Sequence, residues 1–514
     1  MSGNLRVLKV HGLLTAIVFG LAGCASNDTS PVESPNPSLG QVKQALNLNA
    51  ATEKCSQDSR VTLGIVSLDV CVGAELFFRD QFGGNGRSCG SCHPAGHNYT
   101  IDPTFIAGLP ANDALFVAET NPNLSQLERP DLMRNFGLIL ENVDGADNPT
   151  QKFTMRSVPH CLGLSTSITA PAGTTTPPLE RTGWSGDGAP NQGQLRDFQT
   201  GAIFQHYTQS LARVGGTDFI QATSDELDAI SAFVHTIGRT NDIDLTTVSL
   251  TDAGAEAGRT TFNASRCNGC HHNASANIAS GVNQLFDTGI EKVRIATLDT
   301  QGIPRDGGSG GQGLASFNHD ANGDGILDSF GDGRFNTPPL IEAADTGPFF
   351  HTNAFTTIED AISFYNTPAF NQSPAGLAGA PIALNATEVA NMGRFLRVLN
   401  AVLNVQMAIA RVDALTPIID ADKNKTSDLQ QELARLALVE VQDAIHDLDA
   451  VSGLNTAAQA NLASAQASLE TASTQASFLQ RGRAADSART ALVSANTGLG
   501  SGMNFTMGQG TFMF

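Results

Sequence analysis

Two short stretches, Ser88-Cys-Gly-Ser-Cys-His93 and Arg266-Cys-Asn-Gly-Cys-His271, decide how this chain of 514 residues is organised. In such a motif the two thiols add to the vinyl groups of a haem, and the adjacent histidine is held under the iron as an axial ligand. A structural zinc site would instead bring two Cys-x-x-Cys pairs onto one metal, and here 178 residues separate the two histidines. The chain is therefore predicted to carry two covalent haems, one on Cys89, Cys92 and His93 and one on Cys267, Cys270 and His271.

Helical patterns recur in the same order around the two motifs. Apolar residues at helical spacing predict a helix over 72–80 before the first motif and another over 252–263 before the second. Long loops follow each motif, and then a further amphipathic helix, over 225–237 and over 385–402. This internal repeat predicts a mainly α fold with two cytochrome c-like domains, residues 56–240 and 241–412, each with one covalent haem.

The last part of the chain, residues 413–514, differs in character. A helix is expected over 425–450, followed by an Ala-, Ser- and Gln-rich helix that runs to about Ala495. Together they predict an antiparallel helical hairpin. For the Gly-, Met- and Phe-rich tail from Gly498 onward we expect packing or a lack of order rather than metal binding by its methionines.

The N-terminal residues have the pattern of an export signal. A basic start and a short apolar stretch end in Leu21-Ala-Gly-Cys24, which resembles a bacterial lipobox. Residues 1–24 are predicted to be a lipoprotein signal peptide with Cys24 as the lipidated residue; the alternative is an ordinary signal peptide that contains a cysteine. Residues 25–55 read as a flexible tether. Since no Asp follows Cys24, the lipoprotein pattern implies an outer-membrane anchor with the protein facing the periplasm.

The charge balance limits the partners. With 30 Lys and Arg against 50 Asp and Glu, the net charge is −20, which argues against nucleic acid and leaves a lipid anchor as the expected membrane attachment. An acidic surface fits a basic redox partner, although it also simply keeps a secreted protein soluble. An oxidising compartment favours a disulfide between Cys55 and Cys71, with Cys161 left as a free thiol.

One loop has the spacing of a calcium site. Oxygen-bearing side chains stand at positions 1, 3, 5 and 9 of the loop, with glycine at position 6 but no final Glu. Calcium is predicted here, with a plain acidic turn as the alternative. The candidate ligands are Asp320, Asn322, Asp324 and Asp328.

Over about residues 60–405 the chain resembles the dihaem cytochrome c peroxidase and MauG-type family. The matching blocks are Gly73–Asp80 with the first Cys-x-x-Cys-His motif, Phe335-Asn-Thr-Pro-Pro-Leu340, Thr346-Gly-Pro-Phe-Phe-His351 and Ile358–Tyr365. The resemblance implies that His93 and His271 are the proximal ligands and that Trp184 lies between the haems. It also implies a calcium ion between the haems, at Thr346 and Pro348.

The resemblance leaves two positions open. Fourteen residues after His351 stands Tyr365, where peroxidases usually have a Met ligand to the second iron; a tyrosine there resembles the MauG-type enzymes, and Met392 is the competing ligand. Near the first haem, Phe198 and Thr208 stand where peroxidases carry Gln and Glu. Gln199, Gln205 and His206 are possible substitutes, and Phe198 resembles the dihaem rubber oxygenases of the same superfamily.

The function implied is hydrogen peroxide reduction at the first haem, with electrons relayed through the second from a small cytochrome c or cupredoxin. The catalytic candidates are His93, Trp184, Phe198 and His206. One alternative is a peroxide- or dioxygen-dependent oxidation of a bulky organic or protein substrate, as in rubber oxygenases or MauG. The other is a dihaem electron-transfer protein without catalysis.

Overall fold

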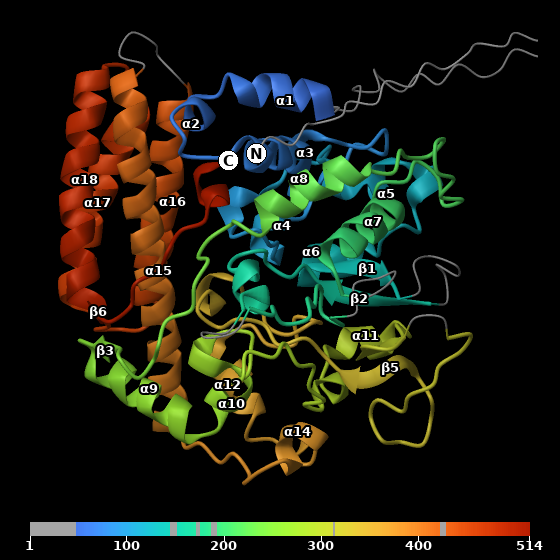
Figure 1. Cartoon of the computed structure of the whole chain (residues 1–514). Coiled ribbons are helices and arrows are strands. Elements are labelled where there is room, and N and C mark those ends of the chain that lie inside the picture. The colour runs from blue at the N-terminus through green and yellow to red at the C-terminus, as the bar shows by residue number, and fades with distance from the viewer. Residues whose placement is uncertain (1–47, 144–151, 171–174, 187–192, 312–313, 422–427) are drawn as a thin grey trace, which may run out of the picture. The chain divides into compact units, whose positions relative to one another are not determined.

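Helices dominate the part of the chain that the computed structural model describes, which is residues 48–143, 152–170, 175–186, 193–311, 314–421 and 428–514 (Figure 1). The mainly α class is confirmed. The predicted signal peptide, Cys24 and most of the predicted tether lie outside the described residues. The described residues belong to one compact unit, and the two predicted domain boundaries within it stay predictions.

Helices before the second motif are α1 (Leu48–Ser56), α2 (Ser59–Thr62), α3 (Leu68–Arg79), α4 (Pro103–Gly108), α5 (Val117–Thr120), α6 (Pro130–Phe136), α7 (Leu195–His206), α8 (Ser224–Val234) and α9 (Ala253–Ala264). From the second motif onward they are α10 (Cys267–Cys270), α11 (Ala296–Thr300), α12 (Ile358–Phe364), α13 (Pro368–Asn371), α14 (Pro374–Leu377), α15 (Ala386–Ala421), α16 (Asp428–Asp449), α17 (Thr456–Thr474) and α18 (Phe478–Leu499).

Three small sheets complete the described structure, and each has two strands. β1 (Leu138–Asn142) pairs antiparallel with β2 (Phe153–Ser157), and β4 (Arg305–Gly308) pairs parallel with β5 (Ser329–Arg334). β3 (Ser249–Leu250) pairs with β6 (Gly500–Ser501), which ties the second half to the C-terminal segment.

The helices predicted around the two motifs are confirmed, with shifted ends. α3 begins at Leu68 because the Ser67 hydroxyl accepts a hydrogen bond from the Val70 amide. α8 begins at Ser224 after a capping box in which Thr223 and Glu226 bond each other's backbone amides. α15 is far longer than expected and continues to Ala421.

The two halves share one helix crossing. In the first half Gly73 of α3 lies so close to α8 that a Cβ at Gly73 would stand 1.9 Å from the Ala229 carbonyl oxygen. In the second half Gly258 of α9 lies against α15, where a Cβ would stand 2.0 Å from the Asn391 carbonyl oxygen. Only glycine allows helices to approach this closely.

Aromatic pairs flank both crossings at matching positions. Phe77, four residues after Gly73, packs edge-on against Phe233 with ring centres 5.3 Å apart. Phe262, four residues after Gly258, packs against Phe395 at 5.6 Å. Since each partner also stands four residues after the residue that faces the glycine, the internal repeat seen in the sequence is a repeat of one packing motif.

The predicted C-terminal hairpin is wrong in its number of helices. The expected second helix is interrupted at Gln475-Ala-Ser477, giving α17 and α18. Buried Arg481 stabilises the break because its Nη2 donates to the Gln475 carbonyl oxygen at 2.7 Å. Each of α15, α16, α17 and α18 packs against two of the others, forming a four-helix bundle, which Figure 1 shows in orange and red.

The tail after α18 is packed against the rest of the protein, which is one of the two outcomes expected from the sequence; the other was a lack of order. Met503 and Met513 are buried in the main core, and Phe514 lies against Phe78 of α3 with ring centres 4.9 Å apart. Arg60 donates to the Phe512 carbonyl oxygen at 3.0 Å. The tail therefore connects the C-terminal helical bundle to the first half of the chain.

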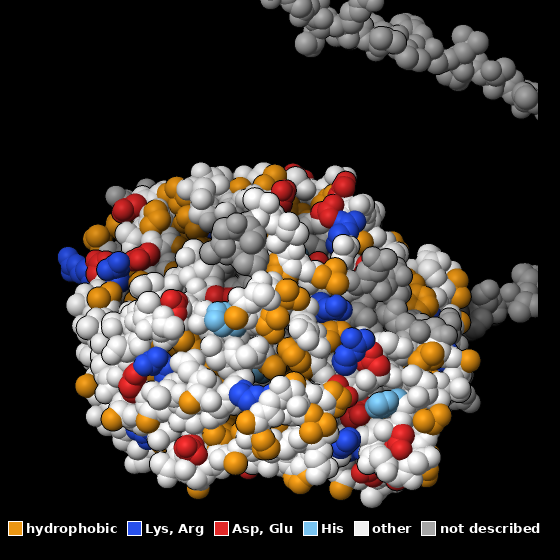
Figure 2. All heavy atoms as spheres, turned by 60° about the horizontal axis from the view of Figure 1, so that its bottom comes forward, with side chains coloured by type: hydrophobic (Ala, Val, Ile, Leu, Met, Phe, Trp, Pro, Cys, Tyr) orange, Lys and Arg blue, Asp and Glu red, His pale blue; other side chains and the backbone are white. Residues whose placement is uncertain are grey.

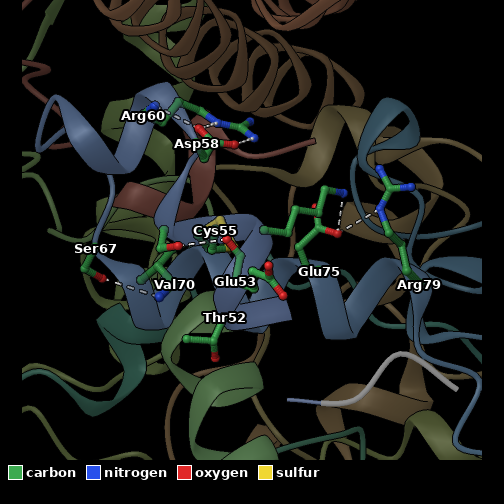
Figure 3. Close-up of a disulfide and its surroundings, with 12 residues drawn as sticks. Thr52, Glu53, Cys55, Asp58, Arg60, Ser67, Val70, Glu75 and Arg79 are labelled. Carbon is green, nitrogen blue, oxygen red and sulfur yellow. Dashed lines mark hydrogen bonds and ion pairs between the residues drawn. A yellow bond between two sulfur atoms is a disulfide. The ribbon is translucent and has the colours of Figure 1, made fainter. Parts of the chain in front are cut away.

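The Cys55–Cys71 disulfide is present and joins α1 to α3 (Figure 3). Beside it, Glu75 of α3 pairs with Lys54 at 2.6 Å and with Arg79 at 3.1 Å. α1 is thus held on α3, the helix that precedes the first motif.

Membrane and surface features follow from burial and charge. α15 is the one described helix whose length and composition would allow it to span a membrane, but 67% of its apolar stretch is buried within the protein. On the face shown in Figure 2, hydrophobic side chains are interspersed with acidic and basic ones.

We predict that Gly73→Ala and Gly258→Ala each destabilise the protein by about 2 kcal/mol or more, because the added methyl groups must push the crossing helices apart. Chemical denaturation of each variant measures this. Gly108→Ala is the matched control, since a Cβ there meets nothing within 4 Å, and we expect it to stay within about 0.5 kcal/mol of the parent. A loss confined to one crossing would contradict the structural equivalence of the two halves.

Candidate functional site

The first Cys-x-x-Cys-His motif follows α3, and its histidine is oriented by the backbone. The His93 Nδ1 lies 2.8 Å from the Tyr99 carbonyl oxygen, so Nδ1 carries the proton and Nε2 is left free. Burial lowers the pKa of His93 to about 4, which keeps the ring neutral at ordinary pH. A neutral imidazole with a free Nε2 is the form that binds a metal.

The second motif repeats this arrangement. Its cysteines lie at the ends of α10, and the His271 Nδ1 lies 3.0 Å from the Pro338 carbonyl oxygen. Burial lowers the pKa of His271 to about 4 as well. Pro338 belongs to the block 335–340 quoted from the sequence. This block therefore contacts the second motif, although Pro338 stands 67 residues after His271 in the chain.

A cavity of about 300 Å³ opens at the first motif, with Cys89, Cys92 and His93 in its wall. Much of the remaining wall is apolar, including Ile139 and Val234. α7 lies along it, and the Tyr207 hydroxyl after α7 donates to the Cys89 sulfur at 3.1 Å. The motif and α7 therefore face one common, mainly apolar space.

The cavity wall fits a haem in its donor set and in its polar atoms. The motif supplies two thiols and one free imidazole nitrogen, which is the attachment set of a covalent haem. Three buried polar atoms in the wall have no hydrogen-bond partner among the described residues: His160 Nδ1, Thr182 Oγ1 and Gln199 Nε2. Buried polar groups normally find partners, so these atoms indicate a missing group with polar atoms of its own.

The side chains predicted on α7 have different positions. Phe198, Gln199 and His206 line the cavity. Gln205 also reaches it, but its amide bonds both the N–H and the carbonyl of Asn142, so it holds β1 in place and is a poor substitute for a catalytic group. Burial, together with Arg87 and Arg213, lowers the pKa of His206 to about 3, and the ring stays neutral.

Two acids near the cavity were missed by sequence reasoning. Glu141 of β1 lines the cavity and pairs with Arg156 at 2.8 Å. Glu128 is fully buried, pairs with Arg87 at 2.7 Å and lies 3.9 Å from the His206 Nδ1. Burial raises the pKa of Glu128. Neither acid stands in a recognisable motif. Glu141 reaches the cavity through the pairing of β1 with β2, and strands were not expected in this part of the chain.

Trp184 connects the cavity to a second aromatic cluster. Its ring lines the cavity and packs on the cluster that contains Phe335, Phe364 and Tyr365. Its Nε1 donates to the Ser157 carbonyl oxygen at 2.9 Å, which fixes the ring. The structure therefore brings the single tryptophan into contact with the surroundings of both motifs.

Of the two candidate sixth ligands at the second motif, Tyr365 lies near it. Burial, followed by the charges of Cys267 and Cys270, raises the pKa of Tyr365 well above its usual range. Its ring packs edge-on against Phe370 with centres 4.8 Å apart. Met392 is buried in the main core on α15, near the crossing with α9. His351 is buried too and stacks on Phe335 at 4.3 Å.

The candidate calcium residues fall in two places. In the loop of Asp320, Asn322, Asp324 and Asp328, the Asp320 carboxylate accepts from the Gly323 and Gly325 amides, and Asp328 pairs with Arg305 at 2.8 Å. These contacts close the loop without an ion, which suits the acidic-turn alternative as well as a calcium site. Thr346 and Pro348 lie instead in the wall of the large cavity.

No protein-family model matches the chain, and none of the curated proteins matches it. Among solved structures it is similar to a MauG-like protein associated with microbial copper homeostasis, with 16% identity, a TM-score of 0.33, and coverage of 64% of this chain and 88% of that one. It is also similar to hydrazine synthase from Kuenenia stuttgartiensis, with 14% identity, a TM-score of 0.31, and coverage of 73% and 99%.

We predict that the purified protein holds two haems per chain that resist acid–acetone extraction. Replacing Cys89 and Cys92 together by Ser should halve the covalent haem, because thioether bonds at that motif can no longer form. Cys161→Ser is the matched control: its sulfur lies 3.5 Å from the His93 Nδ1 in the same cavity, yet it should keep both haems. Pyridine haemochrome spectra give the count, and an unchanged count in the double variant would contradict the assignment.

Proposed function

We propose that this protein is an exported dihaem c-type oxidoreductase that reduces hydrogen peroxide at the His93 haem. One observation carries the proposal: both motif histidines bind a backbone carbonyl through Nδ1 and leave Nε2 free, at 2.8 Å for His93 and 3.0 Å for His271. Two such sites on one chain suit an enzyme that must collect two electrons. The overall reaction is H₂O₂ + 2 H⁺ + 2 e⁻ → 2 H₂O, with a reduced donor protein as the source of electrons.

Cys89, Cys92 and His93 would hold the haem, which when bound would supply the redox-active iron. The surrounding side chains would position the oxidant and its protons. Gln199 Nε2 is buried without a partner in the cavity wall, so it is placed to donate to an oxygen atom. The Glu141 carboxylate is the acid on the cavity wall, oriented by Arg156, and it can pass a proton to an oxygen atom. The mainly apolar wall limits entry of water.

The proposed electron route runs through Trp184. The ring touches the cavity of the first motif and the aromatic cluster that contains Tyr365. A polarisable indole ring bridges this gap better than a void. In this proposal the donor is a small cytochrome c or cupredoxin, for which the net charge of −20 suits a basic docking surface.

A lipid anchor at Cys24 remains part of the proposal and would hold the protein at the outer membrane, facing the periplasm. The tether that starts after Cys24 would let the haem domains reach a soluble donor. Calcium, either in the Asp320 loop or at Thr346 and Pro348, also remains a proposal.

Steady-state turnover with peroxide and a reduced donor tests the activity. Glu141→Gln should lower kcat by about 10²–10⁴-fold, because the amide cannot pass a proton. Glu119→Gln is the control: Glu119 forms a surface pair with Arg134, and we expect turnover within about twofold. Haem content of both variants is measured in parallel. Turnover no faster than that of free haem in the parent protein would refute the proposal.

Replacement of Tyr365 tests the second site. If its phenolate binds the second iron, Tyr365→Phe should raise the reduction potential of that haem, since a hard anionic oxygen favours the ferric state. Met392→Leu is the matched control and should leave the potential unchanged. Potentiometric titration followed by optical absorbance reports both. A shift in Met392→Leu alone would identify methionine as the ligand instead.

The second candidate function is oxidation of an organic substrate, and Phe198 favours it. This side chain lies in the cavity wall where a peroxidase would have a polar group, and an apolar pocket suits dioxygen or a hydrocarbon. A stable ferrous–dioxygen spectrum, or oxidised product from a polyene, would support this candidate over peroxide reduction. The resting paramagnetic resonance spectrum separates both from a carrier: a high-spin ferric signal indicates an open iron, and its absence indicates electron transfer alone.

A further inference from the structure

A cluster of ligand-type side chains lies away from both motifs, where the helical bundle meets the second half. Asp345 is contributed by the 3-10 turn Ala343–Asp345 (η8), and His446 and Asp447 come from α16. The metal-binding atoms of these three side chains all lie within 4.8 Å of one another. Two carboxylates and an imidazole thus converge from two separate segments of the chain.

Asp447 is the independent sign that a ligand is missing. The residue is 1% exposed, and no N–H or hydroxyl group of the described residues donates to either oxygen of its carboxylate. Its polar neighbour is the carboxyl of Asp345, with which it can form a hydrogen bond only if one of the two acids keeps a proton. Two adjacent buried carboxylates without a cation are costly, because both lose their hydration and they repel each other when both are charged. Burial and the carboxylates of Asp345 and Asp443 raise the pKa of Asp447 well above its usual range.

The surrounding side chains orient the cluster but do not neutralise it. Asp345 accepts from the amide groups of Asn400 and Asn404 at 2.5 and 2.6 Å, so its carboxylate is held in place. The basic groups described nearby are bound elsewhere: Arg397 pairs with Glu359, Arg411 pairs with Glu440, and His97 pairs with Asp102. None of these described basic groups forms an ion pair with Asp345 or Asp447, so a bound metal ion would supply the positive charge that the cluster needs.

The donor set selects the kind of cation. Calcium and magnesium prefer sites made of oxygen atoms alone. An imidazole beside two carboxylates suits zinc, which binds three protein ligands and leaves one position for water. His446 is exposed, and so the ion has a direct path from solvent. We propose that Asp345, His446 and Asp447 form a zinc site.

Such a site would fasten α16 to a segment that serves both haem sites. Asp345 stands directly before Thr346, which lines the large cavity, and seven residues after Pro338, whose carbonyl oxygen orients His271. Metal binding to folded protein stabilises it by mass action. Zinc at this position would therefore hold the C-terminal bundle against the loop that supports the haem histidine.

Isothermal titration of the chelator-treated dihaem protein with zinc chloride tests the inference. We expect one equivalent to bind and the thermal midpoint to rise. His446→Ala and Asp447→Asn should each weaken binding at least tenfold and abolish the rise. Asp447→Asn should also raise the midpoint of the metal-free protein, because it replaces one of two adjacent buried acids by a neutral amide. Asp324→Asn, in the separate acidic loop, is the matched control and should bind like the parent.

Two results would overturn the zinc site. One is the absence of zinc binding to the parent, or binding that survives both His446→Ala and Asp447→Asn. The other is displacement of bound zinc by a hundredfold excess of calcium, which would show an oxygen-only site. The haem absorbance spectrum of each variant verifies its fold, so a loss of binding with an unchanged spectrum is attributed to the ligands. Peroxide turnover is not the readout, and failure here leaves the proposed function intact.

Discussion

The close crossing of helices at Gly73 and Gly258 is the constraint on which the rest of the structure depends. Each glycine lets a backbone carbonyl of the partner helix approach to a distance that a Cβ would forbid. An aromatic pair one turn further along fixes the angle of each crossing. Both motifs follow in the chain from these helices, so the two crossings define where each motif begins. The carbonyls of Tyr99 and Pro338 then orient the histidines.

The same crossing serves two sites that differ. At the first motif the chain leaves a large apolar cavity, with Phe198, Gln199 and Glu141 in its wall. At the second motif the neighbours are aromatic, with Tyr365 packed among phenylalanines. Trp184 borders both environments. The two motifs therefore have different surroundings, and the proposed function assigns the small molecule to the first and electron exchange to the second.

The elements that could be predicted from sequence are those with a local signal. Helices α3, α8 and α9 have polar N-caps and regular apolar spacing. Their existence and their order around the motifs could therefore be predicted from the sequence. The break between α17 and α18 could not be predicted, because Gln475-Ala-Ser477 contains neither glycine nor proline and depends on buried Arg481. The thiols and histidines of the site were evident from their spacing. Glu141 was not, since it reaches the cavity only through the pairing of β1 with β2.

The packing of Phe514 against Phe78 has a consequence for how the protein folds. These two rings are in contact although more than 430 residues separate them in the chain. The hydrogen bond from Arg60 to the Phe512 carbonyl oxygen joins equally distant parts of the chain. During synthesis the first half therefore emerges long before its last packing partners exist. Its final closure is a late event, so the first half of a growing chain lacks contacts that the finished protein has.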